Sequence, residues 1–497
     1  MQGKMGAGRV RAGRVSVRTS AYRGTTALSL CMLCALSVSA RAGGILPTGG
    51  QYVAGQGSIA GSGNGLTVMQ SSSRGIVNWQ SFSIGSGNSV FFNNGQGATL
   101  NRVTGGNLSK IDGSLSATGS VYLGYNTATG TIEVATVTGG DQTDSSAVGT
   151  VAGAGNVGGF AGLNAGTLST AEVIQTNVDA PAAYQVGGFV GSNIGDGFIS
   201  SDIVLASNVV GFSQVGGFAG SNSAYIAQSA ASLSVADGTD PAVSGVNQVG
   251  GFAGVNTAAG TIVNSSSEIV GAGPVTGTGN QIGGFAGSNA GSLTGDESSD
   301  DVTGVNFVGG FVGTNSGSVG TSFATGTVGA SGYDAGGLVG YNTLIGSIDQ
   351  SYAVGSVTAL GSAGGLVGLN IGSITDSYAT GSVGAGSSGN AGGLVGINEG
   401  SIATSYATGS ESGPKRLGGL VGSNIGGTIT NGYWDTQASG QAKAFGFDNN
   451  NQSGNVQGLT TLDLQSGLPA NFDPTVWGSD PTINDGYPYL LSLSSSY

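Results

Sequence analysis

The densest group of acidic side chains in the sequence is Asp296, Glu297, Asp300 and Asp301. Carboxylate oxygens are hard ligands of the kind that Ca²⁺ prefers in proteins, so these four residues are a candidate calcium site. The glycine-and-aspartate nonapeptide of calcium-loaded β-rolls does not occur in the chain. A solvated acidic turn between repeats is the simpler interpretation, and paired carboxylates that cleave a glycan are a third.

Histidine is absent from all 497 residues, which narrows the possible chemistry. Its absence excludes Ser-His-Asp triads, HExxH zinc peptidases and imidazole general bases. Both cysteines, Cys31 and Cys34, lie within the first 42 residues, which we expect to be removed, so no thiol is expected in the mature chain. Glycine-rich phrases such as residues 153–158 lack the strand-to-helix context of a dinucleotide site. The sequence therefore predicts no catalytic residue, no cofactor and a protein that is not an enzyme.

One short phrase, Gly-Gly-(Phe or Leu)-(Ala or Val)-Gly-x-Asn, occurs ten times between residues 158 and 424. The closing asparagines follow one another at intervals of 26 to 34 residues, and such a period is typical of stacked repeats. The ten positions are Asn164, Asn193, Asn222, Asn256, Asn289, Asn315, Asn342, Asn370, Asn398 and Asn424.

The composition predicts an all-β fold in which each repeat forms one coil of a β-solenoid with three or four short strands. The chain has 100 Gly and only 9 Pro, and glycine disfavours long helices. In parallel coils the same residue recurs at the strand spacing of about 4.8 Å. We therefore predict a structural ladder of amide side chains at the ten asparagines. The paired glycines would supply positive φ or close backbone approach, and the Phe or Leu after them would point inward.

The first 42 residues contain seven basic residues and no acid, an apolar run at about 25–38, and then Ala40-Arg41-Ala42. This pattern is typical of a secretory signal peptide cleaved near Ala42. The mature chain would keep 13 − 7 = 6 basic residues against 26 acidic ones, so nucleic acid and anionic membranes are not expected partners. No later apolar run reaches the ~20 residues of an integral membrane helix.

Three segments after the signal peptide stand in a recognisable order: Leu46-Pro-Thr-Gly-Gly, residues 78–85 (Asn-Trp-Gln-Ser-Phe-Ser-Ile-Gly) and residues 101–105 (Asn-Arg-Val-Thr-Gly). This region resembles the amino-terminal secretion domain of filamentous-haemagglutinin-like exoproteins, the cargo of two-partner secretion in Gram-negative bacteria. The resemblance implies the start of a right-handed parallel β-helix and export through an outer-membrane two-partner secretion transporter. The residues that carry the secretion motif over to this chain are Asn78, Trp79, Phe82, Asn101, Arg102, Val103, Thr104 and Gly105.

The chain departs from that family after residue 123. Residues 124–130 (Gly-Tyr-Asn-Thr-Ala-Thr-Gly) stand where the family usually has an Asn-Pro-Asn-Gly turn, so the secretion domain is expected to be partial. The later repeats resemble the GLUG motif of bacterial surface proteins, best at residues 336–342 and 364–370, and a Ser-Tyr-Ala phrase follows each of these copies. The predicted domains are a signal peptide at 1–42, a partial secretion domain at 43–130, a GLUG β-solenoid of about ten 26–34 residue repeats at 131–436, and a C-terminal cap at 437–497 that covers the last open edge.

These features predict an exported, filamentous-haemagglutinin-like adhesin at the bacterial cell surface, or secreted from it. It would attach to a surface glycan or protein of the host or of other bacteria through many weak contacts. The alternatives are a β-solenoid enzyme acting on polysaccharide, as a hydrolase or lyase, and a passive structural matrix filament.

Overall fold

The computed structural model describes residues 46–496, except 86, 105–113, 119, 126–130, 133–135, 138–149, 152–155, 170–171, 175–176, 207, 235–240, 272 and 388. The described residues all belong to one compact unit, Gly44–Tyr497. The predicted signal peptide and Gly105 lie outside the described residues. None of the helices in the described part is long and apolar enough to cross a membrane.

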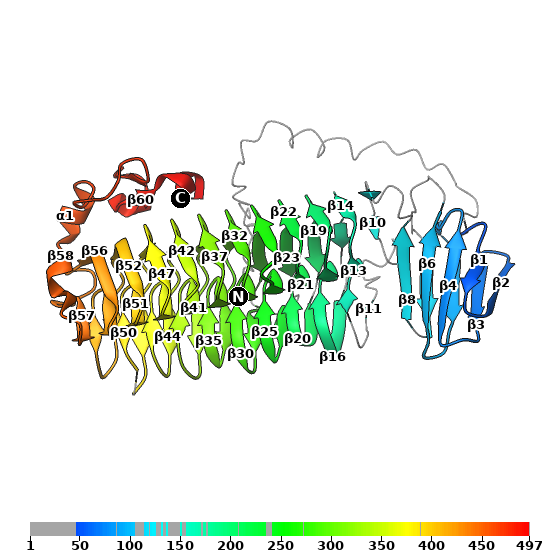
Figure 1. The fold of residues 1–497 in the computed structure, drawn as a ribbon, viewed down its shortest axis with the longest axis horizontal. Helices are drawn as coiled ribbons and strands as arrows, with labels where there is room; N and C mark the ends of the chain where they lie inside the picture. Colours follow the sequence, from blue (N-terminus) through cyan, green and yellow to red (C-terminus); the bar gives the residue numbers. More distant parts are fainter. Residues whose placement is uncertain are drawn as a thin grey trace, which may run out of the picture. The chain divides into compact units, whose positions relative to one another are not determined.

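Two four-stranded sheets form the first part of the described chain (Figure 1). The pairs β1–β4 and β2–β3 are antiparallel, and the later pairs are parallel. Trp79, Phe82, Val90 and Phe92 are buried between the sheets. The first sheet holds β1 (Gln51–Ala54), β4 (Arg74–Trp79), β6 (Ala98–Val103) and β8 (Ser120–Tyr125), and the second holds β2 (Gly57–Ser62), β3 (Gly65–Gln70), β5 (Ser89–Asn93) and β7 (Ser114–Ala117).

Three long parallel sheets form the repeat array, and successive coils add strands to each of them (Figure 1). The register keeps equivalent residues opposite one another, so Asn342 lies between Asn315 and Asn370. The predicted all-β solenoid of parallel coils is therefore confirmed.

We call the 11-stranded sheet the asparagine sheet because the repeat asparagines end its strands. Its strands are β13 (Ala161–Asn164), β17 (Val190–Asn193), β21 (Ala219–Asn222), β26 (Ala253–Asn256), β31 (Ala286–Asn289), β36 (Val312–Asn315), β41 (Val339–Asn342), β46 (Val367–Asn370), β51 (Val395–Asn398), β55 (Val421–Asn424) and β57 (Phe445–Asp448).

We call the 21-stranded sheet the tyrosine sheet because it carries the tyrosines of the later repeats. Its strands are β9 (Thr131–Ile132), β10 (Thr136–Val137), β14 (Thr167–Ser169), β15 (Glu172–Ile174), β18 (Phe198–Ser200), β19 (Ile203–Ala206), β22 (Tyr225–Ala227), β23 (Ala230–Ser234), β27 (Thr261–Val263), β28 (Ser266–Val270), β32 (Ser292–Thr294), β33 (Glu297–Ser298), β37 (Ser318–Gly320), β38 (Phe323–Ala324), β42 (Ser347–Asp349), β43 (Tyr352–Ala353), β47 (Ser373–Thr375), β48 (Tyr378–Ala379), β52 (Ser401–Ala407), β56 (Thr428–Asp435) and β58 (Val456–Leu459).

We call the 18-stranded sheet the threonine sheet because Thr276, Thr303 and Thr358 lie on its outer face. Its strands are β11 (Thr150–Val151), β12 (Val157–Gly158), β16 (Asn177–Gly187), β20 (Val209–Gly216), β24 (Val243–Gly245), β25 (Asn247–Gly250), β29 (Val275–Gly277), β30 (Asn280–Gly283), β34 (Val302–Gly304), β35 (Asn306–Gly309), β39 (Val328–Ala330), β40 (Ala335–Gly336), β44 (Val357–Ala359), β45 (Ala363–Gly364), β49 (Val383–Ala385), β50 (Ala391–Gly392), β53 (Glu411–Ser412) and β54 (Leu417–Gly418).

The Phe or Leu of the repeat phrase points into the core, as the pattern predicts. Phe218, Phe252 and Phe285 are fully buried, and their rings stack at 4.7 Å between centroids. In later coils Leu338 and Leu366 take the same place and are equally buried. Because each ring contacts the rings of the coils before and after it, one coil is stable only through its neighbours.

The paired glycines of the phrase are needed for close backbone approach and not for positive φ. A Cβ on Gly336 would collide with the carbonyl oxygen of Val339, and one on Gly337 with that of Gly365. Left-handed backbone occurs instead at corners of both the tyrosine and the threonine sheets, for example at Gln350 (φ 44°) and Asp334 (φ 56°).

The chain after the last repeat continues the stack and then folds back along it. Strands β57 and β58 extend the asparagine and tyrosine sheets, with the 3-10 turn η1 (Gln452–Asn455) between them. Residues 460–496, here called the strap, then lie against the outer side of the tyrosine sheet, where Trp477 and Leu490 pack with Tyr378 and Tyr406 (Figure 1). The strap contains α1 (Thr461–Gln465), β59 (Trp477–Gly478), η2 (Asn484–Gly486), β60 (Tyr489–Leu490) and η3 (Leu491–Ser496).

Candidate functional site

The ten repeat asparagines form one buried column inside the array. Each Nδ2 donates to the Oδ1 of the asparagine one coil further on, at 2.8 to 2.9 Å. The last of them, Asn424, donates to Oδ1 of Asp448 at 3.0 Å. Because the exposed fraction of these asparagines is 7% for Asn164 and 0% for the others, the column has a structural role and no open face for a ligand.

A second buried ladder, of serine hydroxyls, was not anticipated from the sequence. Ser351 Oγ accepts from the backbone N–H of Ser322 at 3.2 Å, and Ser377 Oγ accepts from that of Ser351 at 3.3 Å. Each of these hydroxyls donates in turn to a carbonyl two residues earlier in its own coil. The Ser-Tyr-Ala phrase of the later repeats was the signal that could have revealed it.

The four candidate calcium ligands do not converge, so the calcium hypothesis is not supported. Asp296 and Asp300 point inward and are buried, whereas Glu297 and Asp301 are exposed. Side chains alternate between buried and exposed along residues 296–302, as they do in extended backbone, and this alternation separates neighbouring acids. In the described part of the chain, no group of three or more His, Cys, Asp or Glu side chains is placed to hold a metal ion.

The two inward acids accept hydrogen bonds from groups of the protein. Asp296 takes a serine's place in the hydroxyl ladder and accepts from the N–H of Ser265 at 2.8 Å. Asp300 accepts from Ser267 Oγ at 2.5 Å and from the N–H of Ile269 at 2.7 Å. Burial raises the pKa of Asp300 to about 7 and that of Asp296 well above its ordinary value, because the charged form loses its hydration.

The secretion-motif residues divide between the inside and the outside of their sheets. Trp79 and Asn101 are buried, and Trp79 Nε1 donates to Asn101 Oδ1 at 2.8 Å. The Phe82 ring meets the Trp79 ring edge-on at 5.3 Å, and Thr104 Oγ1 donates to the Trp79 carbonyl at 2.9 Å. Val103 is buried as well. Four of these residues are buried in the core of the two sheets, whereas Thr104 is exposed and contributes its hydrogen bond to Trp79.

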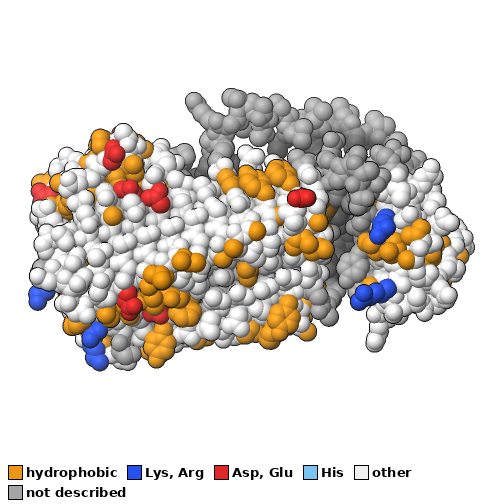
Figure 2. All heavy atoms as spheres, in the orientation of Figure 1, with side chains coloured by type: hydrophobic (Ala, Val, Ile, Leu, Met, Phe, Trp, Pro, Cys, Tyr) orange, Lys and Arg blue, Asp and Glu red, His pale blue; other side chains and the backbone are white. Residues whose placement is uncertain are grey.

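Asn78 and Arg102 lie on the opposite, outward face of β4 and β6. They are register partners on the two strands, and Arg102 is exposed. The Oδ1 atom of Asn78 is buried without a hydrogen-bond partner. Ile76 precedes Asn78 on the same face of β4, and Arg74 lies on that face at the start of the strand. Figure 2 shows apolar side chains between two basic groups on this part of the chain.

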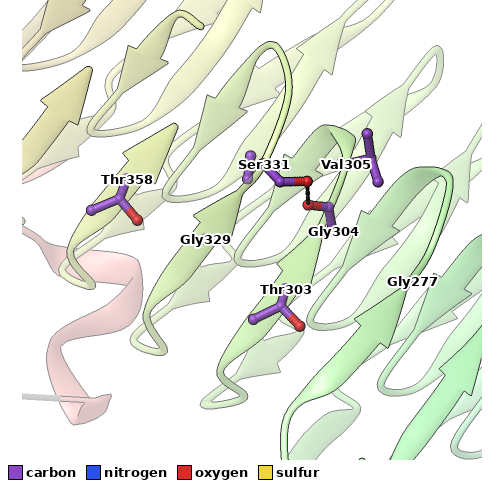
Figure 3. A pocket seen from close by; sticks show the side chains of 8 residues that line it. Gly277, Thr303, Gly304, Val305, Gly329, Ser331 and Thr358 are labelled. Atoms are coloured by element: carbon purple, nitrogen blue, oxygen red, sulfur yellow. Dashed lines mark hydrogen bonds between the residues drawn. The ribbon is translucent and has the colours of Figure 1, made fainter. Parts of the chain in front are cut away.

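Hydroxyl side chains line the outer faces of the array. On the threonine sheet, Thr276 Oγ1 and Thr303 Oγ1 lie 3.0 Å apart. A depression of about 450 Å³ follows, lined by Thr303, Ser331 and Thr358 among other residues (Figure 3). On the tyrosine sheet, one outward row holds Thr261, Ser292, Ser318, Ser347, Ser373, Ser401 and Thr428.

Two parts of the chain match known families. Residues 43–128 match the model of the TPS secretion domain, and residues 331–358 and 359–384 match that of the GLUG motif. The chain carries a TPS secretion domain followed by GLUG motifs. The resemblance to two-partner secretion exoproteins is thus confirmed, and proteins with a TPS domain are secreted or surface-associated.

Individual relatives cover different shares of the chain. The heme/hemopexin-binding protein of Haemophilus influenzae is 40% identical over 80 residues, which are 16% of this chain and 9% of that protein. The crystal structure of the HMW1 secretion domain from Haemophilus influenzae is matched at 12% identity and a TM-score of 0.23, over 83% of this chain and 98% of that one. Since the chain spans only 9% of the curated relative, the ligands in that protein's name are not carried over.

Proposed function

We propose that this protein is the cargo of an outer-membrane transporter and acts outside the cell as an adhesin-like binding protein. The observation that carries the proposal is the match of residues 43–128 to the TPS secretion domain. A domain of this type implies an outer-membrane transporter as its partner. The repeat array would then be the part that makes contacts after export.

The surface that we assign to the transporter is the end of the outward face of β4 and β6 that holds Asn78 and Arg102, away from Arg74. Trp79 and Asn101 are buried and are not available to a partner. Arg102 offers charged donors on the surface, and Asn78 Oδ1 is an acceptor without a partner. The buried Oδ1 of Asn78 has no exposed surface for a partner's donor, so the assignment rests on the exposed Arg102.

Export of Arg102→Gln tests this assignment. Hydrogen bonds to charged groups contribute about 1.5–3 kcal/mol, so the variant should lower the secreted fraction about tenfold. The measurement compares culture medium and periplasm by immunoblot, in a Gram-negative host that co-expresses the cognate transporter. Arg74→Gln is the matched control, because it removes the same charge from the same face outside the motif. Equal export of Arg102→Gln and wild-type protein would contradict the assignment, and full export after deletion of residues 43–130 would contradict the secretion role itself.

The binding role rests on the outward hydroxyl rows of the array. A row such as Ser318, Ser347 and Ser373 repeats at the strand spacing of about 4.8 Å. Each hydroxyl both donates and accepts a hydrogen bond, and single contacts of this kind are weak. Many contacts along one extended ligand add up through multivalency, which suits a glycan or protein of repeating structure.

Retention on a panel of immobilised glycans and proteins tests the binding role. The purified protein should be retained on at least one surface, and the glycan should be recovered intact. Depolymerised glycan would instead support the polysaccharide-acting enzyme. Assembly into filaments without any ligand would support the passive matrix filament.

A further inference from the structure

The outer row of the threonine sheet has one gap that forms a pocket. Register partners along this row are Thr276, Thr303, Gly329, Thr358 and Gly384. Gly329 places no side chain between the two threonines beside it, and the depression of about 450 Å³ lies there (Figure 3).

The lining of this depression combines hydroxyl groups with a small apolar surface. Thr303, Ser331 and Thr358 contribute hydroxyls and Val305 contributes methyl groups, whereas the side chain of Ala330 belongs to the core. Ser331 Oγ donates to the Gly304 carbonyl at 3.3 Å, so its lone pairs remain available to a ligand. Ligand sites commonly combine an apolar lining with a few placed polar groups.

The backbone does not require glycine at position 329. A Cβ built there would meet no atom closer than Thr303 Cγ2 at 3.8 Å, which is ordinary van der Waals contact. Gly329 also lacks the positive φ that favours glycine. The repeat-phrase glycines differ, since a Cβ on Gly336 would collide with a carbonyl oxygen. Glycine within a strand is otherwise unfavourable, so at Gly329 its effect is to leave space.

An exposed aromatic ring and the absence of basic residues restrict the chemical class of ligand that this depression could bind. Tyr333 does not line the depression but follows Ser331 by two residues on the same turn, and its side chain is 64% exposed. A tyrosine in this position offers an apolar ring and a polar tip. Residues 111–414 contain no Lys or Arg, and the whole chain has a net charge of −13. An anionic group would therefore find no counter-charge here and would be repelled.

We propose that this depression, which we call the Gly329 notch, holds one sugar unit of a neutral glycan. The hydroxyls of Thr303, Ser331 and Thr358 would exchange hydrogen bonds with the sugar hydroxyls, and Tyr333 would pack against its apolar face. The inference rests on the proposed adhesion and extends it by naming the ligand class and the place where it binds.

Gly329→Thr is the decisive variant because it completes the threonine row and fills the notch without a backbone clash. Gly384→Thr is the matched control: it makes the same change on the same row, where the nearest atom to a Cβ is Ser412 Oγ at 3.5 Å, and Gly384 does not line the notch. The probes are immobilised glucan, mannan, galactan and chitin oligosaccharides, with alginate as the acidic glycan. Thermal midpoints of both variants check that the fold is intact.

The expected result is that wild-type protein binds at least one neutral glycan and not alginate. Gly329→Thr should weaken that binding about tenfold, as expected for the loss of two hydroxyl contacts, while Gly384→Thr stays within about twofold. Tyr333→Ala should weaken it in the same direction. Unchanged binding by Gly329→Thr, or a preference for alginate, would overturn the notch proposal alone. Failure of the wild-type protein to bind any glycan would overturn glycan adhesion itself.

Discussion

Glu411 takes the place of a core valine at the end of the threonine sheet. It follows Val328, Val357 and Val383 in register, and its side chain is 8% exposed. Neither carboxyl oxygen has a hydrogen-bond partner. Burial raises the pKa of the Glu411 carboxyl to about 8, because the charged form is disfavoured away from water.

Glu411→Gln should make the protein more stable at alkaline pH. The folded chain holds this proton up to about pH 8, whereas the unfolded chain releases it near the ordinary value of 4.5. The folded state therefore binds more protons between these values, and the free energy of unfolding falls as the pH rises through that window. The denaturant midpoints of Glu411→Gln and wild-type protein, measured from pH 5 to pH 9, should therefore move apart as the pH rises. The midpoint of the variant should be the higher one at pH 9.

The raised pKa of Asp300, about 7, acts in the same direction, so the variant removes only part of the pH dependence. Glu399→Gln, at an exposed glutamate, is the control and should follow the wild-type curve. Parallel curves for Glu411→Gln and wild type would contradict the prediction.

At the scale of elements, the strap explains why the Ser-Tyr-Ala phrase occurs only in the later repeats. Tyr352, Tyr378 and Tyr406 stack at 4.9 and 5.0 Å between ring centroids, and the strap covers them. Trp477 lies over Tyr378 and Tyr406, and its Nε1 donates to Asp376 Oδ1 at 3.0 Å. Tyr406 also donates its hydroxyl to the Pro488 carbonyl at 2.6 Å. The tyrosine positions thus mark the coils that the strap packs against.

Trp477→Ala should release the strap and leave the coils stacked. Truncating a buried Trp costs about 3–5 kcal/mol, a loss that falls on the contacts between the strap and the tyrosine sheet. Hydrogen exchange should become faster in residues 460–496 while the strands of the asparagine sheet stay protected. Tyr225→Ala, at a tyrosine that is 38% exposed outside the strap, should leave the exchange of the strap unchanged. Loss of protection throughout the array would show instead that the strap is needed for the whole stack.

At the scale of the whole molecule, the repeating features were the ones that could be predicted from the sequence. The asparagine positions and the inward Phe or Leu recur in every coil, and parallel stacking converts that recurrence into columns. The strap could not be predicted, because a contact such as that of Trp477 with Asp376 joins residues 101 positions apart. The burial of the candidate calcium ligands could not be predicted either, since Asp300 is buried and its neighbour Asp301 is exposed.

The candidate sites were predictable only in part for a related reason. The motif residues Asn78 and Trp79 are adjacent in sequence, yet only the strand pairing shows which side chain faces outward. Gly329 is one glycine among 100. The neighbouring sequence does not distinguish a glycine that is needed for close backbone approach from a glycine that leaves room for a ligand.

The column of asparagine side chains has a direction, and the residue at its carboxyl-terminal end determines which groups can hydrogen-bond there. Every asparagine side chain donates towards the carboxyl-terminal end, so the amide dipoles align head to tail until Asn424 meets Asp448. An ionised carboxylate accepts hydrogen bonds but has none to give. A second chain that docked on this end would find no hydrogen-bond donor at Asp448 for its own side chains. The end of the column therefore disfavours end-to-end polymerisation.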